Sequence, residues 1–190
     1  MHKLIPQSMK RMRQENGGHI FYKFEEKAAY LENAVTFICE AVRSGDDVAV
    51  IESEKILPQL KRKVESVLSA EQQEKVYYIN NFQYYLLNGS FHVSSVEKGF
   101  HRLIEKYDGD VPPLRTWAHV EWGEDADLLE EVALFEQQAD TMISAQKMIS
   151  VCAYQNERIC NTIEKRLQEC HPFFMTDTNL SPSKLYKKTS

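Results

Sequence analysis

The sequence has no hydrophobic run near the roughly 18 residues that a membrane-spanning helix requires. Residues 1–16 contain no apolar core of the kind that a secretion signal carries. Seven glycines and six prolines among 190 residues are too few for a collagen-like or linker-like chain. These absences predict a soluble globular protein of about one domain, which we expect in the cytoplasm and not in a membrane.

Cysteine motifs are also missing, because Cys39, Cys152, Cys160 and Cys170 form no CxxC pair and no regular framework. Without a secretion signal, we expect them to be reduced thiols. Cys160, Cys170 and His171 could be considered as zinc ligands, but zinc sites usually use closely spaced ligand pairs. The sequence therefore predicts no metal site, and it indicates no cofactor.

The charge is unevenly distributed along the chain. A net charge of −5 combines +4 from residues 1–14 and +3 from residues 181–190 with −12 from residues 15–180. Residues 121–140 alone contain eight acidic side chains and no lysine or arginine. Such an acidic body repels a phosphate backbone, so we expect no direct nucleic-acid binding.

No phosphate-binding loop is present, since neither GxxxxGK(S/T) nor GxGxxG occurs. The segment 22–27 follows the first predicted strand and contains two glutamates but no glycine, whereas Gly17 and Gly18 precede that strand. Glycine-rich loops cradle phosphate with their backbone amides, so we expect no conventional ATP or NAD binding. No GxSxG elbow occurs, and adjacent residues such as Cys170 and His171 rarely form a catalytic dyad. We therefore expect no enzyme and no catalytic residues.

Short apolar strands alternate with amphipathic helices along the chain. The predicted strands are 19–24, 48–51, 76–79, 114–122 and 149–154, with an edge strand at 173–175. Helices are predicted at 26–43, 60–68, 94–107, 127–146 and 156–167, with an irregular aromatic connection at 80–92. This order predicts an α/β fold with a mostly parallel, doubly wound sheet and helices on both faces.

The same pattern divides the chain into three parts. Residues 1–17 are predicted to be a basic flexible segment, residues 18–176 the α/β domain, and residues 177–190 a polar basic tail.

The strand 114–122 carries polar groups on one face. Period-two alternation places Arg115, Trp117, His119 and Glu121 together, opposite a face of small and apolar residues. Two interpretations stay open. The strand is either an edge or half-solvated strand with structural hydrogen bonds, or it lines a polar pocket that ends at Glu121 and Trp122.

A carboxylate interrupts the apolar stripe of the helix 127–146. The stripe consists of Leu129, Val132, Glu136, Ala139 and Ile143. A buried carboxylate has to be paired, hydrogen-bonded or protonated, and we expect Arg115 or His119 to be the partner of Glu136. A structural ion pair and a ligand contact are both compatible with this position.

Several short motifs, in this order, resemble the MEDS sensory domain of methanogens, methylotrophs and a dichloromethane-responsive regulator. They lie at residues 19–22, 45–51, 121–122, 135–136, 151–154 and 170–172, and the resemblance spans about residues 18–176. It implies a RecA/KaiC-like fold without a phosphate-binding loop, in a protein that senses a small organic molecule. The residues that the resemblance places at or beside the ligand site are His19, Tyr22, Glu121, Trp122, Glu136, Cys152, Tyr154 and His171.

Together with Arg115 and His119 from the polar strand face, these residues form the predicted ligand site. The predicted function is that of a non-enzymatic sensory or regulatory protein, which binds a small organic ligand and signals through a partner protein. No effector domain accompanies the resemblance, so we expect the output to pass through that partner. The alternatives are a protein–protein adaptor in a stress or sporulation-type signalling circuit, with a vestigial pocket, and an enzyme of unknown chemistry.

Overall fold

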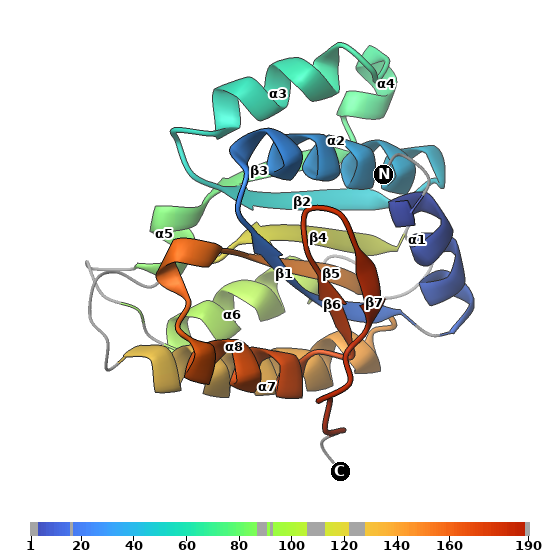
Figure 1. Cartoon of the computed structure of the whole chain (residues 1–190). Helices are drawn as coiled ribbons and strands as arrows, with labels where there is room; N and C mark the ends of the chain where they lie inside the picture. Colours follow the sequence, from blue (N-terminus) through green and yellow to red (C-terminus); the bar gives the residue numbers. More distant parts are fainter. Residues whose placement is uncertain are drawn as a thin grey trace.

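The computed structural model describes residues 4–15, 17–86, 91, 93–105, 113–121 and 128–188. Within them, seven strands form one sheet in the order β3-β2-β4-β5-β1-β6-β7 (Figure 1). The strands are β1 (Gly18–Phe24), β2 (Asp47–Glu52), β3 (Val76–Asn80), β4 (Leu114–His119), β5 (Ile149–Gln155), β6 (Phe173–Met175) and β7 (Leu180–Pro182). Every neighbouring pair is parallel except β6 with β7, which confirms the mostly parallel sheet.

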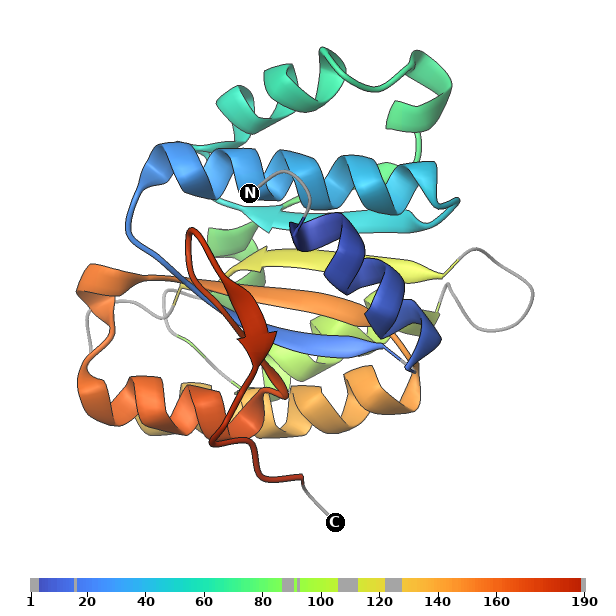
Figure 2. The same ribbon diagram turned by 45° about the vertical axis from the view of Figure 1, so that its right-hand side comes forward.

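Helices cover both faces of this sheet, as predicted (Figures 1 and 2). One face carries α2 (Lys27–Arg43), with α3 (Leu57–Glu65) and the short α4 (Ala70–Gln73) beyond it. The other face carries α6 (Val93–Ile104), α7 (Leu128–Ala145) and α8 (Asn161–Cys170). The short helix α5 (Asn81–Tyr85) follows β3 directly, and a 3-10 turn, η3 (Asn156–Arg158), follows β5.

The sheet separates two hydrophobic clusters. Tyr22 and Trp117 belong to the cluster under α2, whereas Phe21 and Ala118 belong to the cluster under α7 and α8. Successive side chains of a strand point to opposite faces, so both faces of the central strands have to be apolar. This requirement explains the continuous apolar run of β2.

The amino-terminal residues differ from the predicted flexible segment. Leu4–Gln14 form a helix, α1, on which Ile5, Met9 and Met12 are buried against the rest of the core. Spacings of four and three residues place these three side chains on one helix face. The basic residues between them gave this segment the composition of a solubilising tail.

The carboxyl-terminal residues also contain more structure than a polar tail. The strand β7 pairs antiparallel with β6, so Phe173–Met175 are not the edge of the sheet as predicted. A hydrogen bond from the amide of Thr176 to the carbonyl of Asn179 (2.8 Å) closes the turn between the two strands.

Three local predictions are also corrected. Asn81–Tyr85 form a helix instead of an irregular connection, because the Asn80 side chain accepts a hydrogen bond from the amide of Gln83 (3.0 Å) and caps it. The helix α6 begins at Val93, one residue before the predicted start. Asn156 starts the 3-10 turn, and α8 begins only after Cys160.

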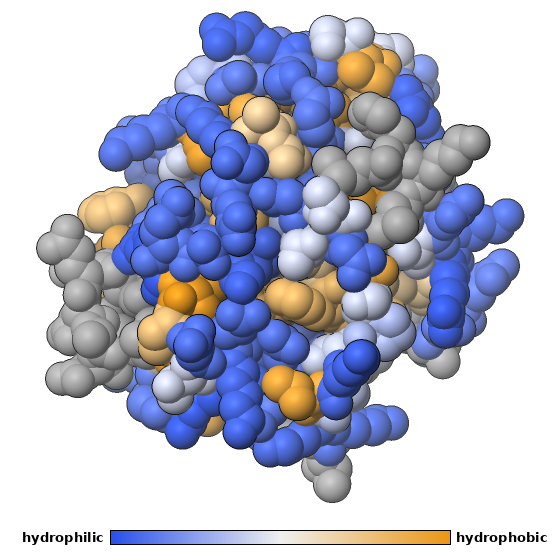
Figure 3. All heavy atoms as spheres, in the orientation of Figure 1, coloured by the Kyte–Doolittle hydropathy of each residue, from blue (hydrophilic) through white to orange (hydrophobic). Residues whose placement is uncertain are grey.

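None of the helices in the described part of the chain has the length and apolar character needed to cross a bilayer. The molecular face in Figure 3 is largely hydrophilic, with small, separate apolar patches.

Candidate functional site

The structure distributes the ten predicted site residues over several places. His119 and Glu121 lie at the carboxyl end of β4. A second group lies on the α7 and α8 side of the sheet and consists of His19, Glu136, Cys152, Tyr154 and His171. Tyr22 and Arg115 lie apart from both groups. The prediction for Trp122 falls outside the described residues.

A cavity of about 580 Å³ opens at the carboxyl ends of the parallel strands. Residues at or just after the ends of β1, β2, β3, β4 and β5 line it. The lining residues at or just after these strand ends are Lys27, Ser53, Asn80, His119 and Gln155. Open α/β sheets bind ligands at this edge, because the loops that follow the strands converge there.

His119 is held in this cavity by buried hydrogen bonds. Its Nδ1 donates to Oε1 of Glu52 (2.7 Å), at the end of the neighbouring strand β2. The other oxygen of Glu52 accepts a hydrogen bond from Tyr30, whose hydroxyl oxygen accepts one from Nε1 of Trp117 (2.9 Å). Burial and the adjacent Glu52 carboxylate hold the pKa of Tyr30 well above its usual value. The network leaves Nε2 of His119 on the side of Glu121, 3.8 Å from its Oε1.

The lining of the cavity contains four charged side chains, two acidic and two basic. Glu121 is already paired with Arg158 (2.5 Å), and Glu54 accepts a hydrogen bond from an amide side chain at the end of β3 (2.8 Å). Lys27 and Lys55 also line the cavity, and neither makes an ion pair with another described residue. The charged lining groups without a partner among the described residues are therefore ammonium groups.

The amino end of α2 binds a carboxylate of the chain itself. Oδ2 of Asp177 accepts hydrogen bonds from the backbone amides of Glu25 (3.1 Å) and Glu26 (2.9 Å), and Oδ1 accepts one from Tyr22 (2.7 Å). Burial and Asp177 together raise the pKa of Tyr22 far above its usual value. A phosphate-binding loop would present its backbone amides at this position, after the first strand. Tyr22 therefore orients Asp177 and does not line the cavity.

The predicted pairing of Arg115 with Glu136 is wrong. Nε and Nη2 of Arg115 both lie 2.6 Å from Oδ2 of Asp46, at the amino end of β4 and on the α2 side of the sheet. Arg13 of α1 approaches the other oxygen of Asp46 at 3.0 Å. Glu136 lies on the opposite side, because α7 covers the face on which Ala118 lies. His119, the second predicted partner of Glu136, is bonded to Glu52 on the α2 side instead.

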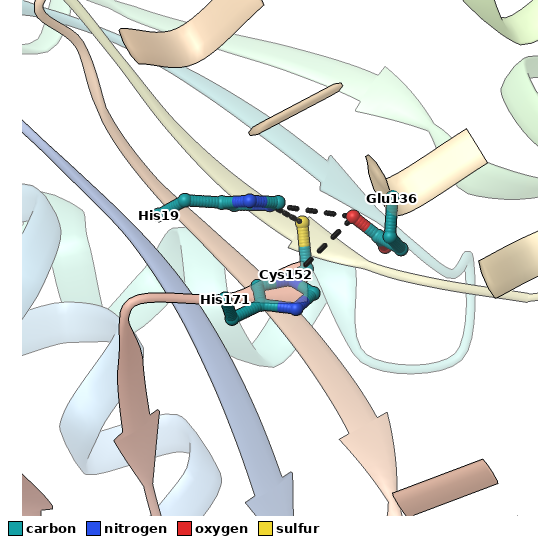
Figure 4. A group of neighbouring side chains, drawn as sticks. All are labelled: His19, Glu136, Cys152 and His171. Atoms are coloured by element: carbon teal, nitrogen blue, oxygen red, sulfur yellow. Dashed lines mark hydrogen bonds and ion pairs between the residues drawn. The ribbon is translucent and has the colours of Figure 1, made fainter. Parts of the chain in front are cut away.

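The predicted burial of Glu136 is confirmed, since the residue has 0 % exposure. Its neighbours are His19 from β1, Cys152 from β5 and His171, the residue after α8 (Figure 4). Oε2 of Glu136 lies 3.3 Å from Nε2 of His19 and 3.5 Å from Nε2 of His171. Nε2 of His19 lies 3.4 Å from Sγ of Cys152. Oε1 of Glu136 accepts a hydrogen bond from the hydroxyl of Tyr154.

Burial and mutual charge shift the protonation of this cluster. Burial opposes ionisation of Glu136, but His171 and His19 outweigh it and hold the pKa of Glu136 well below its usual range. Burial also disfavours charged His19, yet Cys152, Asp140 and Glu136 together raise its pKa well above the usual value. Burial and the Glu136 charge raise the pKa of Cys152 to about 11. His171 shows the opposite shift, because burial and the positive charge of His19 lower its pKa.

The comparison with protein families confirms the resemblance found in the motifs. The family described as "MEthanogen/methylotroph, DcmR Sensory domain" (MEDS) matches residues 18–172, which is most of the chain. Among curated proteins, none matches the sequence.

Solved structures resemble this chain at low sequence identity. The KaiC-like protein PH0186 from Pyrococcus horikoshii OT3 superimposes with a TM-score of 0.54 at 11% identity, over 84% of this chain and 70% of that one. The flagellar accessory protein FlaH from Methanocaldococcus jannaschii gives a TM-score of 0.47 at 12% identity, over 84% and 70% of the two chains. At such identities a likeness shows the fold alone. The match to PH0186 confirms the predicted RecA/KaiC-like architecture.

Proposed function

This chain belongs to the MEDS family of sensory domains, and we propose that it is a non-enzymatic regulator that binds a small organic carboxylate. The ligand occupies the cavity at the carboxyl ends of the strands. Its presence is passed on to a partner protein.

The observation that carries this proposal is the pair of lysines in a cavity of about 580 Å³. Cavities of roughly 300–1,000 Å³ suit small organic ligands. Lys27 and Lys55 supply two ammonium groups without an anionic partner among the described residues. Of the two acidic residues in the lining, Glu121 is paired with Arg158 and Glu54 is hydrogen-bonded to the side-chain amide of Asn80. A carboxylate on the ligand matches this charge.

The remaining lining provides hydrogen bonds and an apolar contact. Asn81, Gln83 and Gln155 line the cavity together with His119, and their side-chain amides suit hydroxyl or carbonyl groups of a ligand. Phe82 contributes an aromatic ring with 58 % exposure. These groups favour a ligand with a short carbon skeleton and oxygen substituents.

Two features support binding without turnover. Asp177 already binds the amides at the amino end of α2, where a nucleotide phosphate would lie. Nδ1 of His119 is bonded to the buried Glu52, and no serine or cysteine is hydrogen-bonded to His119 in the described part of the chain.

A thermal-shift screen tests the ligand class. The protein is heated with a panel of small mono- and dicarboxylic acids, and separately with the corresponding neutral amides. An acid present at 100 times its dissociation constant adds about 2.7 kcal/mol to the free energy of unfolding, while its amide adds little.

Variants locate the binding site. Lys27→Gln and Lys55→Gln are expected to abolish or weaken the shift, while Lys165→Gln on the exposed face of α8 preserves it. Equal shifts from acids and amides would refute the carboxylate, and an unchanged shift in both cavity variants would refute the site.

The partner is sought by affinity purification with and without the ligand found in the screen. A partner whose binding depends on that ligand supports the sensor. If no acid stabilises the protein and a partner binds regardless, the molecule is an adaptor with a vestigial pocket.

A further inference from the structure

Two hydrogen-bond acceptors face each other in the buried cluster beneath α7. Nδ1 of His171 donates to the carbonyl of Leu167 (2.7 Å), so the neutral ring carries its lone pair on Nε2. That nitrogen lies 3.5 Å from Oε2 of Glu136, which is also an acceptor. Neither atom has a hydrogen-bond partner among the described residues, and both are fully buried. Burying two such acceptors against each other is costly unless a cation lies between them.

Three of the six ligand-to-ligand distances in the cluster match those around a tetrahedral metal ion. Zinc bonds of about 2.0–2.1 Å to nitrogen and oxygen and about 2.3 Å to sulfur place neighbouring ligand atoms roughly 3.3–3.7 Å apart. The observed separations are 3.3 Å from His19 to Glu136, 3.4 Å from His19 to Cys152 and 3.5 Å from His171 to Glu136. All four ligand atoms lie within 4.8 Å of one another, and Figure 4 shows the side chains directed toward a common point.

We propose that His19, Glu136, Cys152 and His171 form a site for a zinc-like divalent transition metal ion. Two imidazoles, a thiolate and a carboxylate are a donor set that zinc accepts in tetrahedral geometry. Sequence reasoning predicted no metal, because these four residues form no closely spaced pair and meet only through the fold.

Two of the four proposed ligands, His19 and Glu136, have an outer partner that orients them. Nδ1 of His19 lies 3.4 Å from Oδ1 of Asp140, and these two atoms have no other partner among the described residues. The hydroxyl of Tyr154 donates to Oε1 of Glu136, which leaves Oε2 for the metal. Asp140 is itself held by the hydroxyl of Tyr186 (2.9 Å). Such outer hydrogen bonds are a regular feature of metal sites.

Without a metal ion, hydrogen bonds within the cluster leave one buried acceptor without a partner in the described part of the chain. A proton on Nε2 of His19 can be donated to Glu136 or to Cys152, but it leaves Nε2 of His171 without a donor among the described residues. A single metal ion serves all four atoms at once.

The position of the site indicates a structural metal. The ligands come from β1, α7, β5 and the residue after α8, so the ion would connect four elements that lie far apart in sequence. Four protein ligands leave no open position, as in structural zinc sites. A groove of about 510 Å³ between α7 and α8 is lined by Asp140 and Cys170. The site lies on the opposite side of the sheet from His119 and is independent of the proposed carboxylate ligand.

Cobalt titration of the full chain, first stripped with a chelator, tests the site. One Co²⁺ ion per chain is expected to give the strong visible bands of tetrahedral cobalt together with a thiolate charge-transfer band, and Zn²⁺ is expected to bleach both. Cys152→Ser should lose the charge-transfer band, whereas Cys170→Ser, a matched change beside the cluster, should retain it. No spectrum, an octahedral spectrum, or a charge-transfer band that survives in Cys152→Ser would refute the site.

X-ray absorption of the zinc-loaded wild-type chain provides a measurement that needs no variant. The proposal requires one sulfur and three nitrogen or oxygen neighbours around zinc. A shell without sulfur, or one with two or more sulfurs, would overturn it even if Cys152→Ser failed to fold.

Discussion

The carboxylate of Asp177 accepts a hydrogen bond of 2.9 Å from the backbone amide of Glu26, the residue before helix α2 begins. In a nucleotide-binding relative of this fold, a phosphate would use amides at such a helix start. The chain thus supplies its own anion from the turn between β6 and β7. Residues 22–27, before α2, contain no glycine. None is needed there, because the backbone does not have to wrap around a phosphate.

The first prediction concerns nucleotides. Wild-type protein is expected to show no micromolar binding of magnesium ATP in calorimetry and no ATP hydrolysis, since Asp177 occupies the amides of Glu25 and Glu26. Magnesium-dependent hydrolysis that survives repurification would contradict this.

Asp177 should also contribute to stability. Hydrogen bonds to a charged acceptor contribute about 1.5–3 kcal/mol, and we expect Asp177→Ala to lower the free energy of unfolding by roughly that amount. Asp177→Asn retains an acceptor for Tyr22 and should lose less. Urea denaturation of both variants measures the difference, and equal losses would argue against the charge-assisted bonds.

The buried pair of Arg115 and Asp46 gives a third prediction. Removing one partner of a buried pair leaves an unpaired charge and costs about 3–5 kcal/mol, so Asp46→Asn should lower the free energy of unfolding strongly. The matched control is Glu32→Gln, whose exposed pair with Lys63 should be worth about 0–1 kcal/mol. Chemical denaturation compares them. A loss below about 1 kcal/mol for Asp46→Asn would show that Arg115 finds solvent or another partner.

The Arg115–Asp46 pair also shows which features the sequence could predict and which it could not. Alternation along 114–119 correctly separated Arg115 and His119 from Ala118, because the side-chain period of a strand is two. The stripe around Glu136 correctly predicted its burial. Neither pattern states which helix covers which face, and the prediction of an Arg115–Glu136 pair failed at that step.

The metal site and the contact of Asp177 with α2 could not be predicted from the sequence, for a different reason. His19, Glu136, Cys152 and His171 were each expected at a ligand site, but their separation in sequence gave no metal spacing. Asp177 lies in a segment with the composition of a tail, and only the β6–β7 turn brings it to α2. Long-range contacts of this kind depend on sheet order, which the local pattern does not encode.

A fourth prediction addresses the outer hydrogen bond on Glu136. Tyr154→Phe removes the hydroxyl donor while keeping the ring, so Oε1 of Glu136 loses a partner and the carboxylate is held less firmly. Loss of such an outer contact typically weakens metal affinity about 10–100-fold. Competition with a chromophoric chelator measures the affinity. Tyr186→Phe, one step further from the ligands, is expected to have the smaller effect, and the reverse order would count against the assigned arrangement.

Glu136→Gln separates a metal ligand from a structural ion pair. The amide keeps the shape of the side chain and removes its charge, so packing under α7 changes little. If Glu136 binds zinc, the variant should bind it at least about tenfold more weakly, and zinc should then stabilise it by about 1.4 kcal/mol less than wild type at the same excess. The measurement is urea denaturation of both proteins with zinc and with a chelator.

The pattern of the four unfolding curves decides between the two roles. A charge that only pairs with His19 or His171 would make Glu136→Gln less stable by the same amount with and without zinc, because the missing pair is independent of the metal. A loss confined to the zinc-loaded state assigns Glu136 to the metal. Thermal shifts caused by carboxylates should be equal in Glu136→Gln and wild type, since the cavity beside His119 lies across the sheet from Glu136.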